Sequence, residues 1–254
     1  MKVFVAGATG AIGRQLLPRL VAAGHEVVGM TSRESHRDVV EELGATPVVA
    51  DALDPDQVGD AVGRAAPDVV VHELTSIGAV DLRRFDRSFA RTNRLRTEGT
   101  DHLLAAARAA SVRRFVAQSA IYGFYAREGG PVKTEEDPLD PAPPHHMRES
   151  LAAVRHLEDA VLGATWTEGI VLRYGAFYGP STSMSGGSEQ FELIRKRRFP
   201  LVGSGAGVWS FVHIGDAADA TVAAVERGRR GIYNDPAPVS EWLPALARIL
   251  GARP

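Results

Sequence analysis

Cysteine is absent from the sequence and lysine is rare, being present only at positions 2, 133 and 196. Without cysteine, disulfide bonds, thiolate metal ligands and a cysteine nucleophile are excluded. No apolar run approaches the ~18 residues that cross a bilayer, and no secretory signal pattern precedes the first strand, so we expect a cytoplasmic protein without a membrane segment. The formal net charge of −2 gives no basic field for nucleic acid.

What the sequence does contain is an alternation of short apolar runs and helical patterns. Strands are predicted at residues 2–6, 26–30, 46–50, 68–72 and 114–118, and helices at 11–23, 38–43, 55–65 and 82–110. Strands that are apolar throughout and separated by helices indicate a parallel sheet covered on both faces. The sequence therefore predicts an α/β fold with a doubly wound (Rossmann) parallel sheet.

The second half of the chain is less regular. Residues 123–144 are rich in Gly, Pro and acidic residues, and we expect a helix at 147–162 and a strand at 169–173 after them. Further elements are a strand at 209–213 and helices at 216–227 and 239–250. We expect residues 1–165 to form most of the dinucleotide-binding core. Residues 166–254 would supply its last strands and a small substrate-binding lobe, interleaved as one structural unit.

The first turn of the chain carries the clearest motif. Gly7, Gly10 and Gly13 end the first strand and open the first helix in the spacing G-x-x-G-x-x-G. In this context the glycines allow a tight turn, close approach of a pyrophosphate and close packing of helix on strand, and the amides of the helix start bind phosphate. We therefore expect a dinucleotide on this loop, contacted also by Thr9, Ala11 and Ile12.

At this point the chain resembles the short-chain dehydrogenase/reductase superfamily, in its extended branch of NAD-dependent epimerases and dehydratases. The resemblance spans nearly the whole chain. It rests on GATGAIG and on further segments at 51–54 (DALD), 93 (the Asn of RTNRLR), 172–175 (LRYG), 178–180 (YGP), 210–216 (SFVHIGD) and 231–234 (GIYN). It implies cofactor contacts from Asp51, Ala52, Leu74, Thr75, Asn93 and Tyr174.

The end of the second strand distinguishes NADP from NAD. A carboxylate there binds the ribose hydroxyls of NAD, whereas a cation accommodates the 2′-phosphate of NADP. The chain has Thr31, Ser32 and Arg33 at this point, and a guanidinium binds phosphate in bidentate fashion. We expect NADP as the cofactor, with NAD as the alternative and Arg37 as a second candidate cation.

The family's catalytic pair is missing. Its mechanism uses a Tyr with a Lys four residues later, where the ammonium lowers the pKa of the phenol. No lysine here has a tyrosine four positions before it, and the two family positions fall on Ser150 and Val154. Other groups could move a proton. The candidates are Ser119, Tyr122 and Tyr125 after the fifth strand and His146, with its neighbour His145, before the 147–162 helix.

We therefore expect an enzyme that transfers hydride between NADP and a small polar carbonyl or alcohol, or a sugar nucleotide, with an unusual proton donor. A non-catalytic NADP-binding regulator and a redox-neutral enzyme on the same scaffold remain alternatives. The acidic run at 135–137 has no further ligands at metal spacing, so no metal site is expected. Family members commonly dimerise through the two long helices, which suggests a homodimer by analogy.

Overall fold

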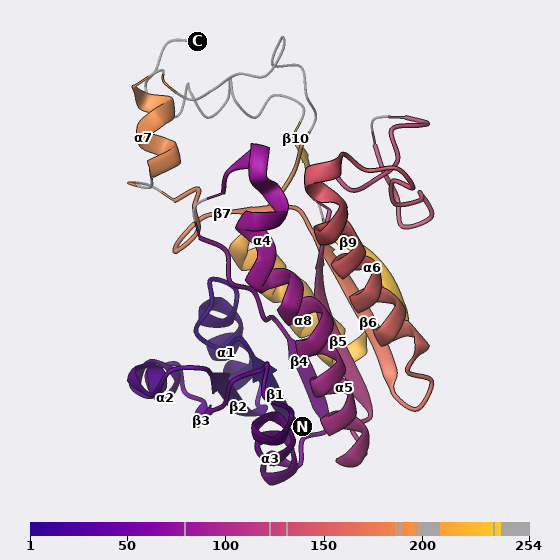
Figure 1. Ribbon diagram of the computed structural model, residues 1–254. Helices are drawn as coiled ribbons and strands as arrows, with labels where there is room; N and C mark the ends of the chain where they lie inside the picture. The colour runs from indigo at the N-terminus through magenta and orange to yellow at the C-terminus, as the bar shows by residue number, and fades with distance from the viewer. Residues whose placement is uncertain are drawn as a thin grey trace.

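A parallel sheet forms the centre of the computed structural model, which describes residues 1–78, 80–121, 123–130, 132–185, 187, 189–196, 198, 209–235 and 237–239 (Figure 1). Within these residues it has seven strands in the order β3-β2-β1-β4-β5-β6-β9. Their bounds are β1 Lys2–Ala6, β2 Glu26–Thr31, β3 Thr46–Val49, β4 Val69–His72, β5 Arg114–Ala120, β6 Glu168–Tyr174 and β9 Gly231–Asp235. The order reverses between β1 and β4, where ligands of such sheets bind.

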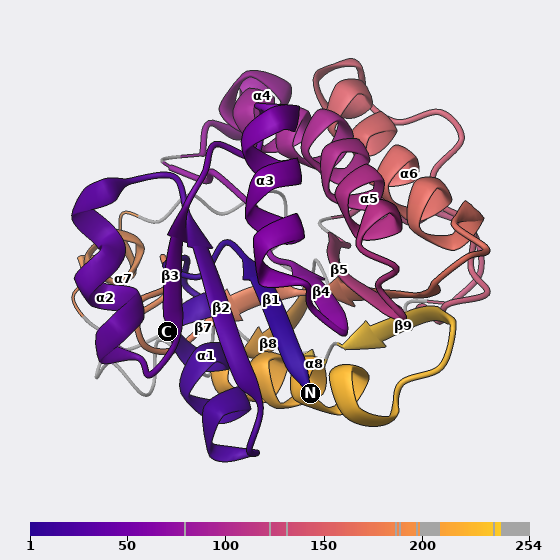
Figure 2. The same cartoon turned by 90° about the horizontal axis from the view of Figure 1, so that it is seen from below.

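Helices cover both faces of this sheet, as Figure 2 shows from below. On one face lie α1 (Gly13–Ala22), α2 (Arg37–Glu42) and α8 (Ile214–Arg227), and on the other α3 (Pro55–Ala65), α5 (Thr100–Ala109) and α6 (Arg148–Gly163). Alternate strand residues feed the two clusters, Val69 and Val71 on the α1 face and Val70 on the α5 face. The predicted doubly wound α/β fold is confirmed.

The helix predicted over residues 82–110 is present, but it contains irregular turns. The stretch expected as a single helix over residues 82–110 forms a 3-10 turn Leu82–Arg84, α4 (Phe85–Arg94), a π turn Leu95–Gly99 and then α5. The hydroxyl of Thr97 donates to the carbonyl of Asn93, and the hydroxyl of Thr100 donates to the carbonyl of Arg96. Such side-chain bonds compete with the backbone hydrogen bonds of a regular helix. The spacing of hydrophobic residues alone does not reveal this competition.

A second, smaller sheet joins strands from the later part of the chain. It contains β7 (Ala176–Tyr178), β8 (Trp209–His213) and β10 (Ala237–Val239), and α7 (Glu189–Arg195) lies between β7 and β8 in sequence. Strands β6 and β9 return to the main sheet, so residues beyond 165 contribute to both sheets. The helix predicted at 239–250 lies outside the described residues apart from Val239, which ends β10.

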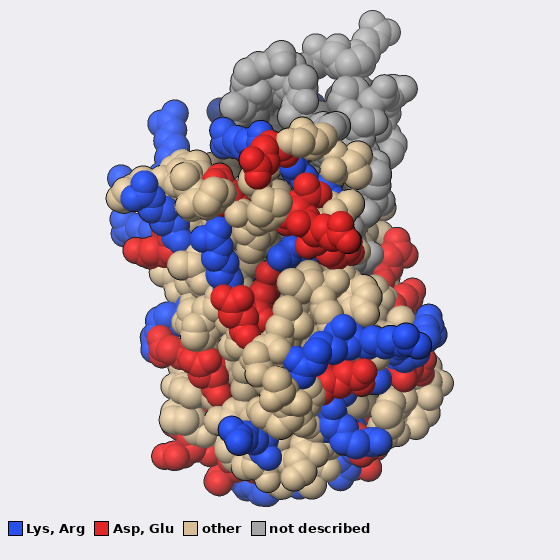
Figure 3. Space-filling view, turned by 90° about the vertical axis from the view of Figure 1, so that its right-hand side faces the viewer, with Lys and Arg blue, Asp and Glu red and all other residues tan. Residues whose placement is uncertain are grey.

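The charges of the surface are mixed. Figure 3 shows Lys and Arg interspersed with Asp and Glu on one face of the molecule. In the described part of the chain, no helix combines the length and the apolar character that crossing a lipid bilayer requires.

Candidate functional site

The glycine loop joins β1 to α1 at the carboxyl edge of the sheet. Gly7 has φ of +98°, and a Cβ added there would lie 2.6 Å from the carbonyl oxygen of Glu73. A Cβ on Gly13 would lie 2.4 Å from the carbonyl oxygen of Gly7. Both positions therefore require glycine, because a side chain at Gly7 would collide with the end of β4 and one at Gly13 would collide with the loop itself.

This loop fits a pyrophosphate. The first helical hydrogen bond of the turn runs from the amide of Arg14 to the carbonyl of Gly10, 3.1 Å apart. The amides of Ala11, Ile12 and Gly13 precede it, at the end of the helix where the dipole is positive. Backbone donors that converge beside side-chain-free glycines form an anion site. The residues present thus have the geometry to hold the phosphates of a dinucleotide.

Hydroxyl groups and basic side chains gather at the end of β2. The Thr9 Oγ1 lies 3.5 Å from Thr31 Oγ1 and 3.3 Å from His36 Nδ1. Thr31 is buried, whereas Arg33 is exposed and its amide donates to Thr31 Oγ1. The 3-10 turn Glu34–His36 follows Arg33, and the amide of His36 donates to the carbonyl of Arg33 at 3.0 Å. Arg37 instead forms an ion pair with Glu34.

The residues predicted to contact adenine lie next to this cluster, after β3. Asp51 accepts a hydrogen bond from the amide of Leu53 at 3.1 Å, and Ala52 is buried. The carbonyl of Ala52 lies 3.0 Å from the Nδ1 of His102 on α5, which fixes the turn against that helix. These contacts shape a rigid wall beside the end of β2.

Leu74 and Thr75 follow β4, and a buried histidine positions the first of them. The Nδ1 of His72 accepts from the amide of Leu74 at 3.2 Å, and its Nε2 lies 3.0 Å from the hydroxyl of Thr100. Burial, with a smaller contribution from the charge of Arg96, lowers the pKa of His72 to about 4. The ring is therefore neutral at physiological pH and holds the turn as a hydrogen-bonded spacer. Thr75 is exposed.

Ser119 ends up in a buried ionic network. Its hydroxyl donates to Glu158 Oε1 at 2.7 Å, and Arg173 binds both oxygens of Glu158 at 2.8 and 2.6 Å. Burial lowers the pKa of Arg173, but the hydrogen bonds and the charge of Glu158 outweigh it and the net shift is upward. Ser119 thus lies on the α6 side of β5 as a donor to a carboxylate, and its catalytic role stays a prediction.

Tyr125 joins the same network from the loop after β5. Its hydroxyl donates to Asn234 Oδ1 at 2.7 Å and accepts from Arg173 Nη1 at 3.0 Å. His146 and its neighbour His145 are exposed in a 3-10 turn, His145–Met147, before α6. Tyr122 lies outside the described residues. The structure thus brings Tyr125, but not His146, to the network of Ser119.

The two residues predicted to occupy the positions of the family's Tyr and Lys, Ser150 and Val154, lie on α6. The Ser150 hydroxyl donates to Asp86 Oδ1 at 2.7 Å, and Asp86 also accepts the amides of Glu149 and Ser150. This carboxylate from α4 thereby caps the first turn of α6. Val154 is fully buried in a cluster with Phe85, Phe89, Phe124 and Leu151. Ser150 is tied to a structural bond, and Val154 offers no polar group.

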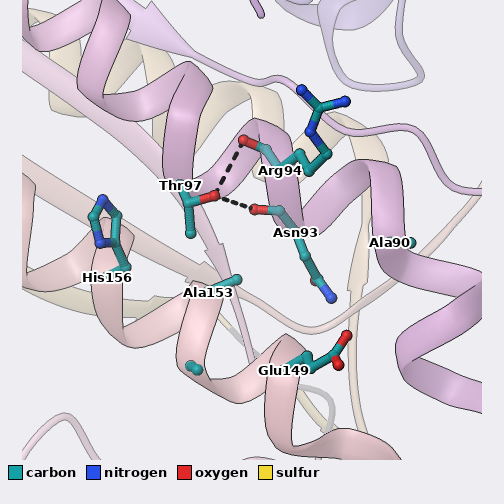
Figure 4. A pocket seen from close by; sticks show the side chains of 8 residues that line it. Ala90, Asn93, Arg94, Thr97, Glu149, Ala153 and His156 are labelled. Carbon is teal, nitrogen blue, oxygen red and sulfur yellow. Dashed lines mark hydrogen bonds between the residues drawn. The ribbon is translucent and has the colours of Figure 1, made fainter.

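Two further residues predicted to bind the cofactor, Asn93 and Tyr174, form hydrogen bonds with side chains of helices. The amide of Asn93 donates to the Ser150 hydroxyl at 3.1 Å, and Asn93 faces a surface groove of about 580 Å³ between α4 and α6 (Figure 4). The buried hydroxyl of Tyr174 lies 2.6 Å from that of Thr221 on α8. Both roles in cofactor binding stay predictions.

Sequence reasoning missed three residues at this edge. His36 and Arg14 approach Thr9, with the Arg14 side chain donating to its carbonyl, and Glu73 is buried beside Gly7. His36 could have been found from its position three residues after Arg33. Glu73 could have been found because it is a charged residue directly after an apolar strand. In the part of the chain that the structure describes, no group of three acidic or histidine side chains could hold a metal ion.

Known proteins with similar sequences and structures have the same fold and belong to a nucleotide-dependent family. The model of the "NAD dependent epimerase/dehydratase family" matches residues 3–234. A 3-diazoavenalumate denitrifying reductase from a Streptomyces species is 44% identical over the whole chain and 83% of its own length. A 4-hydroxy-2-methyl-3-oxo-4-farnesyl-3,4-dihydroquinoline-1-oxide ketoreductase from Stigmatella aurantiaca is 31% identical over 94% of this chain and 70% of its own.

Among solved structures, the UDP-glucose 4-epimerase of Thermus thermophilus in complex with NAD superposes with a TM-score of 0.75 at 25% identity. The superposition covers all of this chain and 85% of the epimerase. Because the family model takes in most of the chain and the glycine loop stands where such a fold binds its nucleotide, the chain belongs to the NAD dependent epimerase/dehydratase family.

Proposed function

We propose that this protein is an NADP-dependent reductase that transfers hydride to a small aromatic substrate whose reduction needs no proton from the enzyme. The observation that carries the proposal is the state of the two positions that a Tyr and a Lys occupy in the family. Ser150 is engaged with Asp86, and Val154 is packed among phenylalanines. Neither can supply or hold a proton near neutral pH.

The chemistry that fits such a site is reductive loss of nitrogen from an arenediazonium ion. Hydride adds to the ring carbon, the C–N bond breaks, and N₂ leaves with the electron pair of that bond. Charge and atoms balance without a proton, because the cation and the hydride give a neutral arene and N₂. Reduction of a carbonyl instead makes an alkoxide that must be protonated. The name of the Streptomyces relative, a denitrifying reductase of a diazo compound, supports this interpretation.

The cofactor would be held by three groups of residues along the edge of the sheet. The amides of Ala11 to Gly13 would bind the pyrophosphate, and Asp51 and Ala52 would flank the adenine. Arg33 would bind the 2′-phosphate together with the Thr9 and Thr31 hydroxyls and His36, since cations and hydroxyl donors suit a dianion. The bound nucleotide would supply the hydride, and these residues would hold and orient it.

A second candidate is the carbonyl reduction expected from the sequence, with Tyr125 as the proton donor. The hydroxyl of Tyr125 accepts a hydrogen bond from the Arg173 guanidinium, which also lies over its ring, 5.4 Å from the ring centroid. The guanidinium and Asn234 together fix the orientation of this hydroxyl. The Stigmatella relative named as a ketoreductase supports this alternative.

One experiment separates these functions. The purified protein is mixed with NADPH and either a 4-hydroxycinnamate bearing a 3-diazonium group or a panel of aromatic ketones, and NADPH absorbance is followed. We expect oxidation of NADPH with the diazonium ion, matched one to one by N₂, and an unchanged rate in the Tyr125→Phe variant. Ketone reduction that Tyr125→Phe abolishes would support the second candidate instead. Binding of NADPH without any turnover would leave the regulatory alternative.

We also propose that the protein forms a homodimer through α4 and α6. The groove of Figure 4 runs between these helices, and Ala90 and Ala152 on its rim are small and exposed. Small residues let a second helix pair approach closely. Light scattering should report a dimer for the wild type and a monomer for Ala152→Arg, and a monomeric wild type would exclude this assembly.

A further inference from the structure

Glu73 stands at the point where the strand order reverses. It follows β4 directly, and its amide donates to the carbonyl of Ala6 at 2.8 Å. The missing side chain of Gly7 leaves room for the carbonyl of Glu73, since a Cβ there would come within 2.6 Å of it. The backbone of Glu73 therefore forms one wall of the crevice that the glycine loop opens.

The carboxyl group lies on the α1 face of the sheet. Along β4 the side chain of Val71 joins the cluster of α1 and α8, and the next side chain, His72, binds Thr100 of α5. Strand alternation returns Glu73 to the α1 face. The register pairs His72 with Ala117 of β5, so Glu73 and Gln118 are neighbours at the edge of the sheet.

Both polar side chains are buried without full hydrogen bonding. Glu73 is 2% exposed, and among the described residues neither of its carboxyl oxygens has a partner. The Oε1 of Gln118, which is 5% exposed, has none either. A buried carboxyl without partners destabilises a protein, because it loses its hydration and gains nothing in return. The unpartnered Glu73 carboxyl lies beside the glycine loop, so we look for its function in the binding of the ligand.

No charged neighbour explains the carboxyl. Burial is the sole cause that raises the pKa of Glu73, with no charged side chain of the described residues contributing. His72 and Arg96 interact on the opposite face, as do Glu158 and Arg173. On the α1 face, the guanidinium of Arg14 donates to the carbonyl of Thr9 in the glycine loop. In the free protein, burial thus favours the protonated, neutral form of Glu73.

The proposed cofactor site indicates which part of the ligand Glu73 would meet. The adenosine half would lie over β2 and β3, beside Arg33 and Asp51, and the pyrophosphate over β1 and α1. The nicotinamide half would then extend over β4 and β5, where Glu73 directly follows β4 and Gln118 lies two residues before the end of β5. The nicotinamide is neutral when reduced and cationic when oxidised.

We propose that Glu73 is the counter-charge of the oxidised nicotinamide ring, ionising when the cation is beside it and remaining a neutral acid beside the reduced ring. This inference rests on the cofactor site of the proposed function. With the oxidised nucleotide bound, Glu73 would be a carboxylate and its proton would have passed to solvent, whereas with the reduced nucleotide bound it would keep that proton. Glu73 would thereby favour donation of hydride over its return.

Calorimetry tests this without any substrate. NADP⁺ and NADPH are titrated into the wild type, Glu73→Gln and Glu73→Leu between pH 6 and 9, in buffers that differ in ionisation enthalpy, so that proton release is counted. We expect the wild type to release up to one proton with NADP⁺ and none with NADPH. Its NADP⁺ affinity should rise about tenfold per pH unit while the free carboxyl is protonated.

In Glu73→Gln we expect that proton release to vanish, NADP⁺ to bind about tenfold more weakly at pH 8 and NADPH to bind within about twofold of the wild type. Glu41→Gln, on the exposed side of α2, should behave as the wild type. Glu73→Leu guards against a folding defect, because it removes the buried polar group. Equal proton release with both nucleotides, or release that persists in Glu73→Gln, would overturn the role of Glu73 alone. Failure of both nucleotides to bind would overturn the cofactor site as well.

Discussion

Two parts of the same sheet edge have opposite characters. Around β1 and β4 the glycine loop consists of backbone groups, and Gly7 and Gly13 have no room for a side chain. Around β5 and the start of α6 the interior is filled by side chains, with Ser150 bound to Asp86 and Val154 packed against aromatic rings.

The difference shows which requirements the chain retains. A pyrophosphate is recognised by backbone amides, whose positions demand glycine regardless of the reaction. An acid–base pair depends on two side chains, and under the proposed reaction neither is needed. Ser150 and Val154 instead hold α6 against α4, the first through Asp86 and the second through Phe85 and Phe89.

The largest effect is expected from closing the glycine loop. Gly13→Ala places a Cβ against the Gly7 carbonyl, so we expect nucleotide binding to be lost and the free energy of unfolding to fall by about 3 kcal/mol. Gly63→Ala on α3 is the matched control. A Cβ there meets nothing within 4 Å, and it should stabilise the helix by about 1 kcal/mol. If calorimetry showed that Gly13→Ala binds the nucleotide nearly as tightly as the wild type, the glycine loop would not be the pyrophosphate site.

Acid should weaken the fold through His72, which follows from the lowered pKa of this residue on β4. The pKa of His72 is lowered to about 4 by folding, so the unfolded chain binds the extra proton first and stability is lost as pH falls from about 6.5 to about 4. The loss amounts to about 3 kcal/mol.

Glu73 has the opposite dependence. Its pKa is raised by folding, so its contribution to stability falls as pH rises above its unfolded value near 4.5. Urea unfolding should therefore reveal the histidine effect most clearly in Glu73→Gln and not in the double variant His72→Gln/Glu73→Gln. Equal pH profiles for these two proteins would argue against a neutral His72 in the fold.

The α6 side can be weakened by itself. Asp86→Ala removes the acceptor of three hydrogen bonds at the start of α6 and should lower the free energy of unfolding by about 2 kcal/mol. NADPH affinity should change less than twofold. Asp101→Ala, which breaks an exposed ion pair with His156 of α6, should cost under about 1 kcal/mol. A large loss of NADPH binding in Asp86→Ala would show that the two parts are not independent.

The smallest expected effect concerns which nucleotide the protein prefers. Arg33→Ala should weaken NADPH about tenfold and leave NADH within about twofold, because only the 2′-phosphate loses a partner. Arg64→Ala, an exposed arginine of α3 paired with Asp60, is the control. If Arg33→Ala left the preference for NADPH over NADH unchanged, the 2′-phosphate would have to be bound by other residues of the chain.

The sequence predicted the first of the two parts better than the second. Apolar strand runs and the spacing of Gly7, Gly10 and Gly13 are local signals, and they predicted the parallel sheet and the turn into α1. The partners of Ser119 and Ser150, which are Glu158 and Asp86, are 39 and 64 residues away in the chain. No local pattern reports such contacts, so both serines could be named from the sequence but not their hydrogen bonds.

The π turn at Leu95–Gly99 has a consequence for how this chain can vary. Phe85, Phe89, Leu103 and Ala107 are spaced as one stripe of an ordinary helix, yet the first two pack with α6 and the last two with α3 and the sheet. The wider turn redirects the stripe. Loss of one codon there would restore a regular helix and keep the present facing of α4 and α5, because one residue fewer gives the same offset of about 100° that the wider turn gives now. The packing of α4 on α6 and of α5 on the sheet would both be retained, so this turn is where the long helix can lose a residue without repacking either neighbour.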